Sequence, residues 1–89
     1  MAYTIKVLDK AERELSKLPK KDSNRIVESI DKLALNPFPM GVKPVKGLKD
    51  HFRIRVGNYR LIYQVRQEVL VIVVVRIGHR REVYRKLKM

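Results

Sequence analysis

The chain has 89 residues, no cysteine, and a formal net charge of +12 that results from 21 basic and 9 acidic side chains. This length suits one domain (1–89), and the lack of cysteine excludes disulfides and thiolate metal sites. With two histidines and few acids, we expect no metal site and no cofactor. The excess of positive charge predicts a polyanionic partner.

Alternating apolar residues predict that the chain begins with a strand formed by Tyr3, Ile5 and Val7. Asp9 and Glu12 have the spacing of a capping box that opens a helix. The apolar stripe of this helix is Ala11, Leu15 and Leu18.

A second helix is predicted after Pro19, which ends the first one. Its apolar face contains Ile26, Ile30 and Leu33 at helical spacing. The proline-rich segment 36–41 must stop this helix.

Residues 51–65 have the alternation of a β-hairpin with a two-residue turn at Gly57 and Asn58. This turn would pair Val56 with Tyr59, Ile54 with Leu61 and Phe52 with Tyr63 on an apolar face. The other face would carry His51, Arg53, Arg55, Arg60, Ile62 and Gln64. Arg55 would then lie opposite Arg60, a like-charge pair that destabilises a sheet.

The segment 69–77 is almost entirely apolar, which predicts a central strand covered on both faces. Gly78 ends it, and residues 81–88 are expected to form a short, highly basic helix. The longest apolar run is too short to span a bilayer, and no signal-like run is present, so we expect a cytoplasmic protein that makes no membrane contact.

The two parts of the chain differ in their basic residues. Residues 51–89 contain eight Arg and two Lys against two Glu, a net charge of +8. Arginine binds phosphate bidentately and stacks on bases, so this part is expected to contact RNA. For a single arginine, solubility is the simpler explanation, and lone histidines and Tyr84 are commonly surface or packing residues. Three arginines at adjacent positions favour a binding surface.

Two segments carry a family resemblance: the hairpin sequence from Arg53 to Tyr63, and the run Gly78-His79-Arg80-Arg81-Glu82-Val83-Tyr84. Together with the order of elements, they resemble the RelE/ParE toxins of toxin–antitoxin pairs. The resemblance implies an α+β fold, a mainly antiparallel four-stranded sheet with two N-terminal helices packed on it and a short C-terminal helix.

The resemblance also implies a function, that of a metal-independent endoribonuclease that cuts messenger RNA in the ribosomal A site and inhibits translation. An acidic RelB-like antitoxin would hold it inactive in an oligomeric complex, and such a segment could cover a basic surface. The ParE branch instead poisons DNA gyrase. A non-catalytic RNA-binding module and a surface that docks only an acidic protein remain alternatives.

Carried over by position, the resemblance implies catalytic roles for Arg53, Arg60, Arg80 and Tyr84, and the last three favour the RelE branch. The RNA 2′-hydroxyl is the nucleophile, and arginines can neutralise the charge that develops on the phosphate. In the best-known pattern of the family, lysines occupy the positions of Arg53 and Arg55, and one of them is assigned as the base. A guanidinium is a poor substitute for that role. We therefore add His79 as the candidate proton carrier, with His51 as the other histidine. The expected RNA contacts are Arg55, His51, Arg81, Arg85 and Lys86.

Overall fold

The computed structural model describes residues 2–79, and it has an α+β fold with two helices and one sheet. The helix predicted over 81–88 lies outside the described residues. In chain order the elements are β1 (Thr4–Val7), α1 (Asp9–Ser16), α2 (Lys20–Leu35), β2 (Lys43–Pro44), β3 (His51–Val56), β4 (Tyr59–Arg66) and β5 (Val71–His79).

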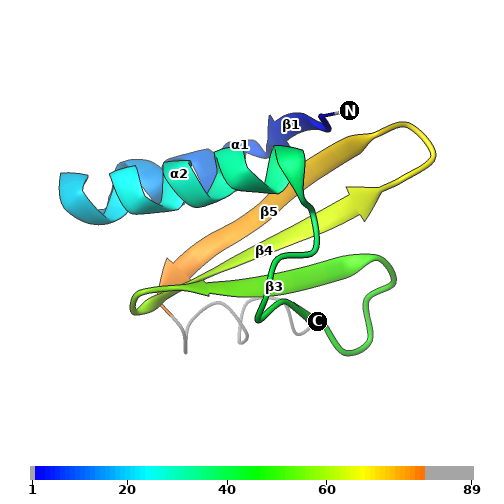
Figure 1. Cartoon of the computed structure of the whole chain (residues 1–89). Coiled ribbons are helices and arrows are strands. Elements are labelled where there is room, and N and C mark those ends of the chain that lie inside the picture. Colours follow the sequence, from blue (N-terminus) through cyan, green and yellow to red (C-terminus); the bar gives the residue numbers. More distant parts are fainter. Residues whose placement is uncertain (1, 80–89) are drawn as a thin grey trace.

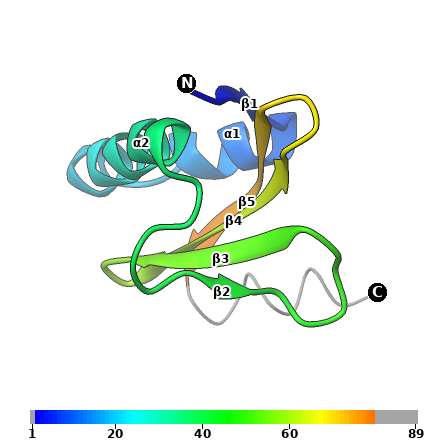
Figure 2. The same cartoon turned by 45° about the vertical axis from the view of Figure 1, so that its right-hand side comes forward.

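The sheet is mixed and has five strands in the order β1-β5-β4-β3-β2 (Figure 1 for the first four, Figure 2 for β2). The prediction of four strands was wrong, because β2 is a fifth strand of only two residues. A strand of this length has no readable alternation, and its Pro44 is tolerated because β2 lies at the edge of the sheet. The strand β1 runs parallel to β5, with Thr4 opposite Val71, whereas the other pairings are antiparallel.

Both helices cover the same face of the sheet, and β2 lies beside β3 away from them (Figure 2). Alternate strand residues face the helices and meet their apolar stripes. The buried core on this face includes Ala11, Ile26, Ile30, Leu33, Val56, Leu61, Tyr63, Val65, Ile72, Val74 and Ile77. The predicted central position of β5 is confirmed, since it lies between β1 and β4. The predicted bounds 69–77 were wrong, because the strand spans Val71–His79 and continues through Gly78, which pairs with Arg60.

The predicted start of α1 was wrong by one residue. Leu8 is the N-cap and makes no side-chain capping bond, while Asp9 is already the first helical residue. Asp9 and Glu12 both lie in the first turn, where their negative charge complements the positive end of the helix dipole. The acidic pattern therefore located the helix terminus through its charge, because no capping box forms there.

The hairpin between β3 and β4 has the predicted turn and register. Gly57 has a φ of 61°, the left-handed conformation that this two-residue turn requires. The pairs are Val56–Tyr59, Ile54–Leu61 and Phe52–Tyr63 on one face, and Arg55–Arg60 and Arg53–Ile62 on the other. The alternation and the turn residues therefore predicted correctly which side chains share each face.

The face of the sheet opposite the helices also has a small apolar cluster of its own. Ile62 is completely buried there against Val45, and Leu48 and Val75 pack on the pair. The N–H of Val45 donates a 2.9 Å hydrogen bond to the carbonyl of His51, which fixes the connector 45–50 against β3. This face is therefore partly covered, although the sequence presented it as a row of polar side chains with one isoleucine.

A buried ion pair joins α1 to the end of β5. Nη2 of Arg76 lies 2.6 Å from Oε2 of Glu14, and the N–H of Ile77 donates a 3.0 Å hydrogen bond to Oε1 of the same carboxylate. The pairing of β1 with β5 ends at Val74. Beyond that point β5 has no strand beside it on this side, and Glu14 accepts the hydrogen bond of the Ile77 N–H in place of a longer β1. No helix among residues 2–79 is long and apolar enough to cross a membrane.

Candidate functional site

Four basic side chains surround one hollow of about 290 Å³ at the outer edge of β3. It is lined by Lys43 of β2, Arg53 and Arg55 of β3, and Arg60 of β4, together with Gly41 and Ile54. The hollow lies where β2 begins: Lys43 is the first residue of that strand and pairs with Arg53, and Gly41, two residues earlier and outside the sheet, has a φ of 89°. No acidic side chain contributes to this lining within residues 2–79.

The cations of this basic hollow lie side by side because of the strand register. Lys43 pairs with Arg53, and Arg55 pairs with Arg60. Phe52 and Ile54 pack on the helix-side core, so the arginines that alternate with them face away from the helices. Like charges directly opposite one another destabilise a sheet, so an anion bound between them would remove a real cost.

Aromatic side chains fix the loop that leads to Gly41, which lines the hollow. The hydroxyl of the buried Tyr63 donates a 2.6 Å hydrogen bond to the carbonyl of Pro37. Phe38 packs edge-on against Phe52, with ring centroids 5.1 Å apart. Because these contacts hold the loop that leads to Gly41, the shape of the hollow depends on the helix-side core.

A second hollow, of about 420 Å³, adjoins the first and shares Gly41, Ile54 and Arg55 with it. Its other lining residues are Ser29, Lys32, Leu33, Asn36, Pro39 and Met40. Met40 is fully exposed at its rim. Neither this groove nor Lys43 was predicted from the sequence, in which the alternation of Val42 and Lys43 ahead of the hairpin was the available signal.

His51 does not reach the basic hollow. It begins β3, pairs with Gln64, and places Nδ1 2.8 Å from the carbonyl oxygen of Lys49. A carbonyl oxygen only accepts, so Nδ1 carries the proton in this contact. This contact holds the imidazole at the far end of β3, away from the basic hollow.

His79 lies on the other side of the sheet from the arginines. It pairs with Tyr59, whose ring meets the imidazole edge-on at 6.1 Å, and Tyr59 packs on the helix-side core. Arg60 pairs instead with Gly78. The hydroxyl of Tyr59 donates a 3.1 Å hydrogen bond to Asp22, which raises the pKa of this tyrosine. The structure thus brings together Arg53, Arg55 and Arg60, but not His79.

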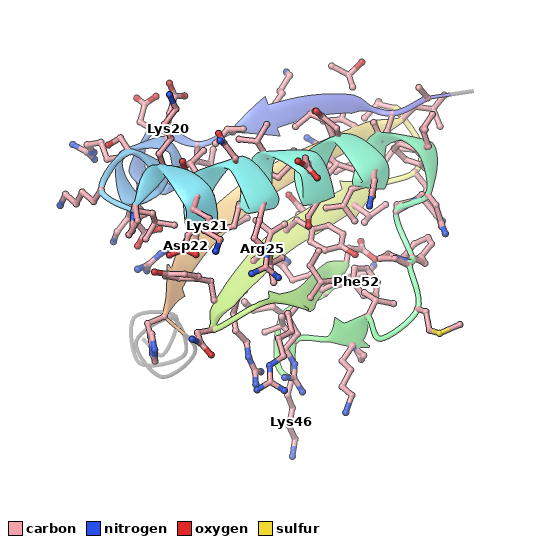
Figure 3. The ribbon with its side chains drawn as sticks, turned by 60° about the vertical axis from the view of Figure 1, so that its left-hand side comes forward. Lys20, Lys21, Asp22, Arg25, Lys46 and Phe52 are labelled. Carbon is pink, nitrogen blue, oxygen red and sulfur yellow. The ribbon has the colours of Figure 1, made fainter. Side chains whose placement is uncertain are left out.

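The basic residues at the N-terminal end of α2 belong to this helix side as well. Figure 3 shows Arg25 pointing from α2 towards the sheet, close to Lys21 and Asp22. The guanidinium of Arg25 lies near Gly57 in the hairpin turn. In the same view Lys46 projects from the opposite side of the sheet. The remaining predicted site residues, Arg80, Arg81, Tyr84, Arg85 and Lys86, lie outside the described residues.

No group of three or more His, Cys, Asp or Glu side chains within residues 2–79 is arranged to hold a metal ion. Residues 5–84 match the family model for the ParE toxin of the type II toxin–antitoxin system parDE. The chain belongs to the RelE/ParE toxin family. The expected resemblance is therefore confirmed over most of the sequence.

Members of the RelE/ParE family from bacteria and archaea are similar to this chain. Toxin RelG of Mycobacterium tuberculosis is 33% identical over 87 residues, which cover 97% of this chain and all of the relative. The RelE–RelB complex of Pyrococcus horikoshii aligns with a TM-score of 0.81 at 31% identity, covering 92% of this chain and 99% of that one. A mutant of Escherichia coli RelE in the free state aligns with a TM-score of 0.80 at 27% identity over the whole of both chains.

Proposed function

We propose that this toxin is a metal-independent endoribonuclease that cleaves messenger RNA in the ribosomal A site and thereby inhibits translation. The observation that carries the proposal is the basic hollow, in which side chains from three strands place four cations around one space. A row of phosphates is the ligand best suited to such a surface, because guanidinium groups bind phosphate oxygens bidentately.

The RNA provides its own nucleophile, so the protein must orient the chain and stabilise charge. The 2′-oxygen attacks the adjacent phosphorus, and negative charge grows on the phosphoryl oxygens. Arg60 and Arg53, which line the hollow, are suited to stabilise that charge without changing protonation state. By family resemblance, Arg80 would assist them, and Tyr84 would position a base or relay a proton.

An acidic antitoxin of the RelB kind is the proposed partner in the cytoplasm. The Pyrococcus horikoshii relative was solved with RelB, and so was RelE of Escherichia coli. The net charge of +12 and the basic hollow favour a partner segment rich in Asp and Glu. We expect this segment to contact Arg53, Arg55 or residues 81–88 and to form an oligomeric toxin–antitoxin complex.

A second candidate function is inhibition of DNA gyrase, since the matching family model is described as a ParE toxin. A gyrase inhibitor would leave messenger RNA intact and block supercoiling. The two functions therefore differ in a direct biochemical assay.

The deciding experiment compares messenger cleavage in a translating extract with cleavage of the same RNA without ribosomes. The purified, antitoxin-free toxin is compared with an Arg80→Ala/Tyr84→Ala variant, and gyrase supercoiling is measured in parallel. Ribosome-dependent cuts that vanish in the variant support the nuclease. No cuts and blocked supercoiling would favour the gyrase inhibitor.

Salt dependence of binding separates an RNA surface from one that binds only protein. Neutralising Z phosphates of a single strand gives a slope of about −0.7Z when the logarithm of the binding constant is plotted against that of salt. If each of the four basic side chains that line the hollow contacts one phosphate, the expected slope is about −2.8. A flat plot would contradict the RNA interface.

A further inference from the structure

One role in the proposed reaction has no provider among the arginines of the basic hollow. A 2′-hydroxyl must lose its proton as its oxygen attacks phosphorus, and a positioned base accelerates that step. Guanidinium groups do not deprotonate in proteins, so Arg53, Arg55 and Arg60 cannot accept the proton. Gly41 and Ile54 have no group that can.

Lys43 is the one side chain in the described lining of the hollow that can exchange a proton. An amine nitrogen cycles between a neutral and a protonated form, as catalytic lysines do. The two histidines in the chain are elsewhere: His51 lies at the far end of β3 against Lys49, and His79 lies on the helix side beside Tyr59.

The backbone of Lys43 and of the residues that follow it is fixed. Lys43 itself pairs with Arg53, and Pro44 pairs with Phe52. Val45 is buried against Ile62 and donates its N–H to the carbonyl of His51. A catalytic group must be held within hydrogen-bond reach of its proton, and a short strand anchored by a buried cluster provides such a position.

We propose that Lys43 is a catalytic residue, the general base of the cleavage reaction. This inference rests on the proposed ribonuclease function. The neutral Nζ takes the 2′-hydroxyl proton and becomes an ammonium, while the 2′-oxygen bonds to phosphorus. The bond from phosphorus to the 5′-oxygen breaks, and that oxygen takes a proton from solvent or a second donor. The products are a 2′,3′-cyclic phosphate and a 5′-hydroxyl.

The charged groups that face Lys43 are all cationic within residues 2–79: Arg53 and Arg55 from β3, and Arg60 from β4. These arginines would bind the oxygens of the phosphate that the 2′-oxygen attacks. In the bound complex the ammonium formed on Lys43 would also lie beside that phosphate. The base and the charge-stabilising groups would thus act in one space.

The test is a Lys43→Arg variant, which keeps the positive charge but removes the exchangeable amine. Single-turnover cleavage is measured against pH, and RNA binding is measured against salt. We expect Lys43→Arg to cleave about 100-fold more slowly, the lower end for loss of a general base. Its salt slope should be unchanged. Cleavage by the unaltered toxin should accelerate with rising pH, as expected of a reaction that uses a general base, and the variant should lack this rise.

Lys6→Arg is the matched control. Lys6 is an exposed lysine on β1, the strand at the opposite edge of the sheet. Its neighbours Ile5 and Val7 pack on the core, so Lys6 also faces away from the helices. The control should cleave at the unaltered rate. Added methylamine should restore cleavage to a Lys43→Ala variant, because a small amine can replace the missing base.

The outcomes separate this inference from the proposed function. Full-rate cleavage by Lys43→Arg with an unchanged pH profile would overturn the role of Lys43 and leave the ribonuclease standing. An absence of rescue by methylamine in a folded, RNA-binding Lys43→Ala variant would also count against it. No cleavage by the unaltered, folded toxin would overturn both.

Discussion

The two faces of the sheet are made from the same strands but use their side chains for opposite purposes. The face towards the helices buries a continuous apolar core, in which Leu61, Tyr63, Ile72 and Val74 are fully inaccessible. The other face has a two-residue cluster, Val45 and Ile62, and beside it the basic hollow. One face is arranged for stability, and the other retains the unfavourable Arg55–Arg60 pairing.

Three consecutive residues of β4 show this contrast most directly. Arg60 and Ile62 face away from the helices, and Leu61 between them is in the main core. Because successive side chains of a strand point to opposite faces, neighbouring substitutions can test stability and activity separately.

The largest effect is expected for Leu61→Ala, which should lower the free energy of unfolding by about 2–5 kcal/mol by opening a cavity in the main core. Urea denaturation followed by circular dichroism measures it. Ile62→Ala should lose less, because the smaller cluster around it can collapse more easily, but it should also slow cleavage by releasing the segment that holds Lys43. Equal losses of stability and equal cleavage in the two variants would remove the contrast between the faces.

The next effect is on activity. Arg60→Gln should reduce messenger cleavage roughly 10²- to 10³-fold, the usual result of removing one donor that stabilises transition-state charge. The free energy of unfolding should stay nearly constant, because the substitution also relieves the repulsion with Arg55. Lys6→Arg again serves as the control. If Arg60→Gln unfolds the protein while its residual folded fraction cleaves normally, then Arg60 is structural.

The ion pair between α1 and β5 should have an intermediate effect on stability. Glu14→Ala leaves the guanidinium of Arg76, which is 5% exposed, without its carboxylate. We expect a loss of about 3 kcal/mol, at the lower end for breaking a buried pair because Glu14 is partly exposed. A Glu14→Leu/Arg76→Met variant should recover part of that loss. Thermal unfolding compares the variants, and no difference between the single and double variants would contradict a buried uncompensated charge.

The smallest effect is expected for Tyr63→Phe, which removes the hydrogen bond to Pro37 and should cost about 1–1.5 kcal/mol. Cleavage should change little unless the loop at Gly41 shifts. Tyr3→Phe is the control, since it keeps the Pro37 contact. Urea titrations of the two variants at neutral pH measure the difference.

Alkaline pH examines the same tyrosine in another way. Burial raises the pKa of Tyr63 from 10.0 to about 12. The folded protein therefore keeps this proton where the unfolded chain loses it, so the associated stability is complete below pH 10 and falls between pH 10 and about 12. Tyr63→Phe should have a flatter dependence in that range. A parallel decline in both proteins would assign the effect to other groups.

The helix-side face was predictable because its signals are local. The period of the apolar residues located both helices, and the Gly57–Asn58 turn fixed the register of the hairpin and hence the Arg55–Arg60 pair. The capping prediction for Asp9 failed because helix termini depend on backbone geometry that a four-residue pattern does not specify. The strand β2 was missed because two residues carry no period.

The sequence by itself determined the helices, the hairpin register, the positive charge and the family resemblance, since each depends on neighbouring residues or on motif order. Tertiary structure decided the parallel pairing of β1 with β5, the burial of Arg76 on Glu14 and the opposite placement of His79 and Arg60. It also placed Lys43 in the basic hollow. These contacts join segments that are far apart in the chain. They depend on how the elements pack in three dimensions, which no pattern of neighbouring residues specifies.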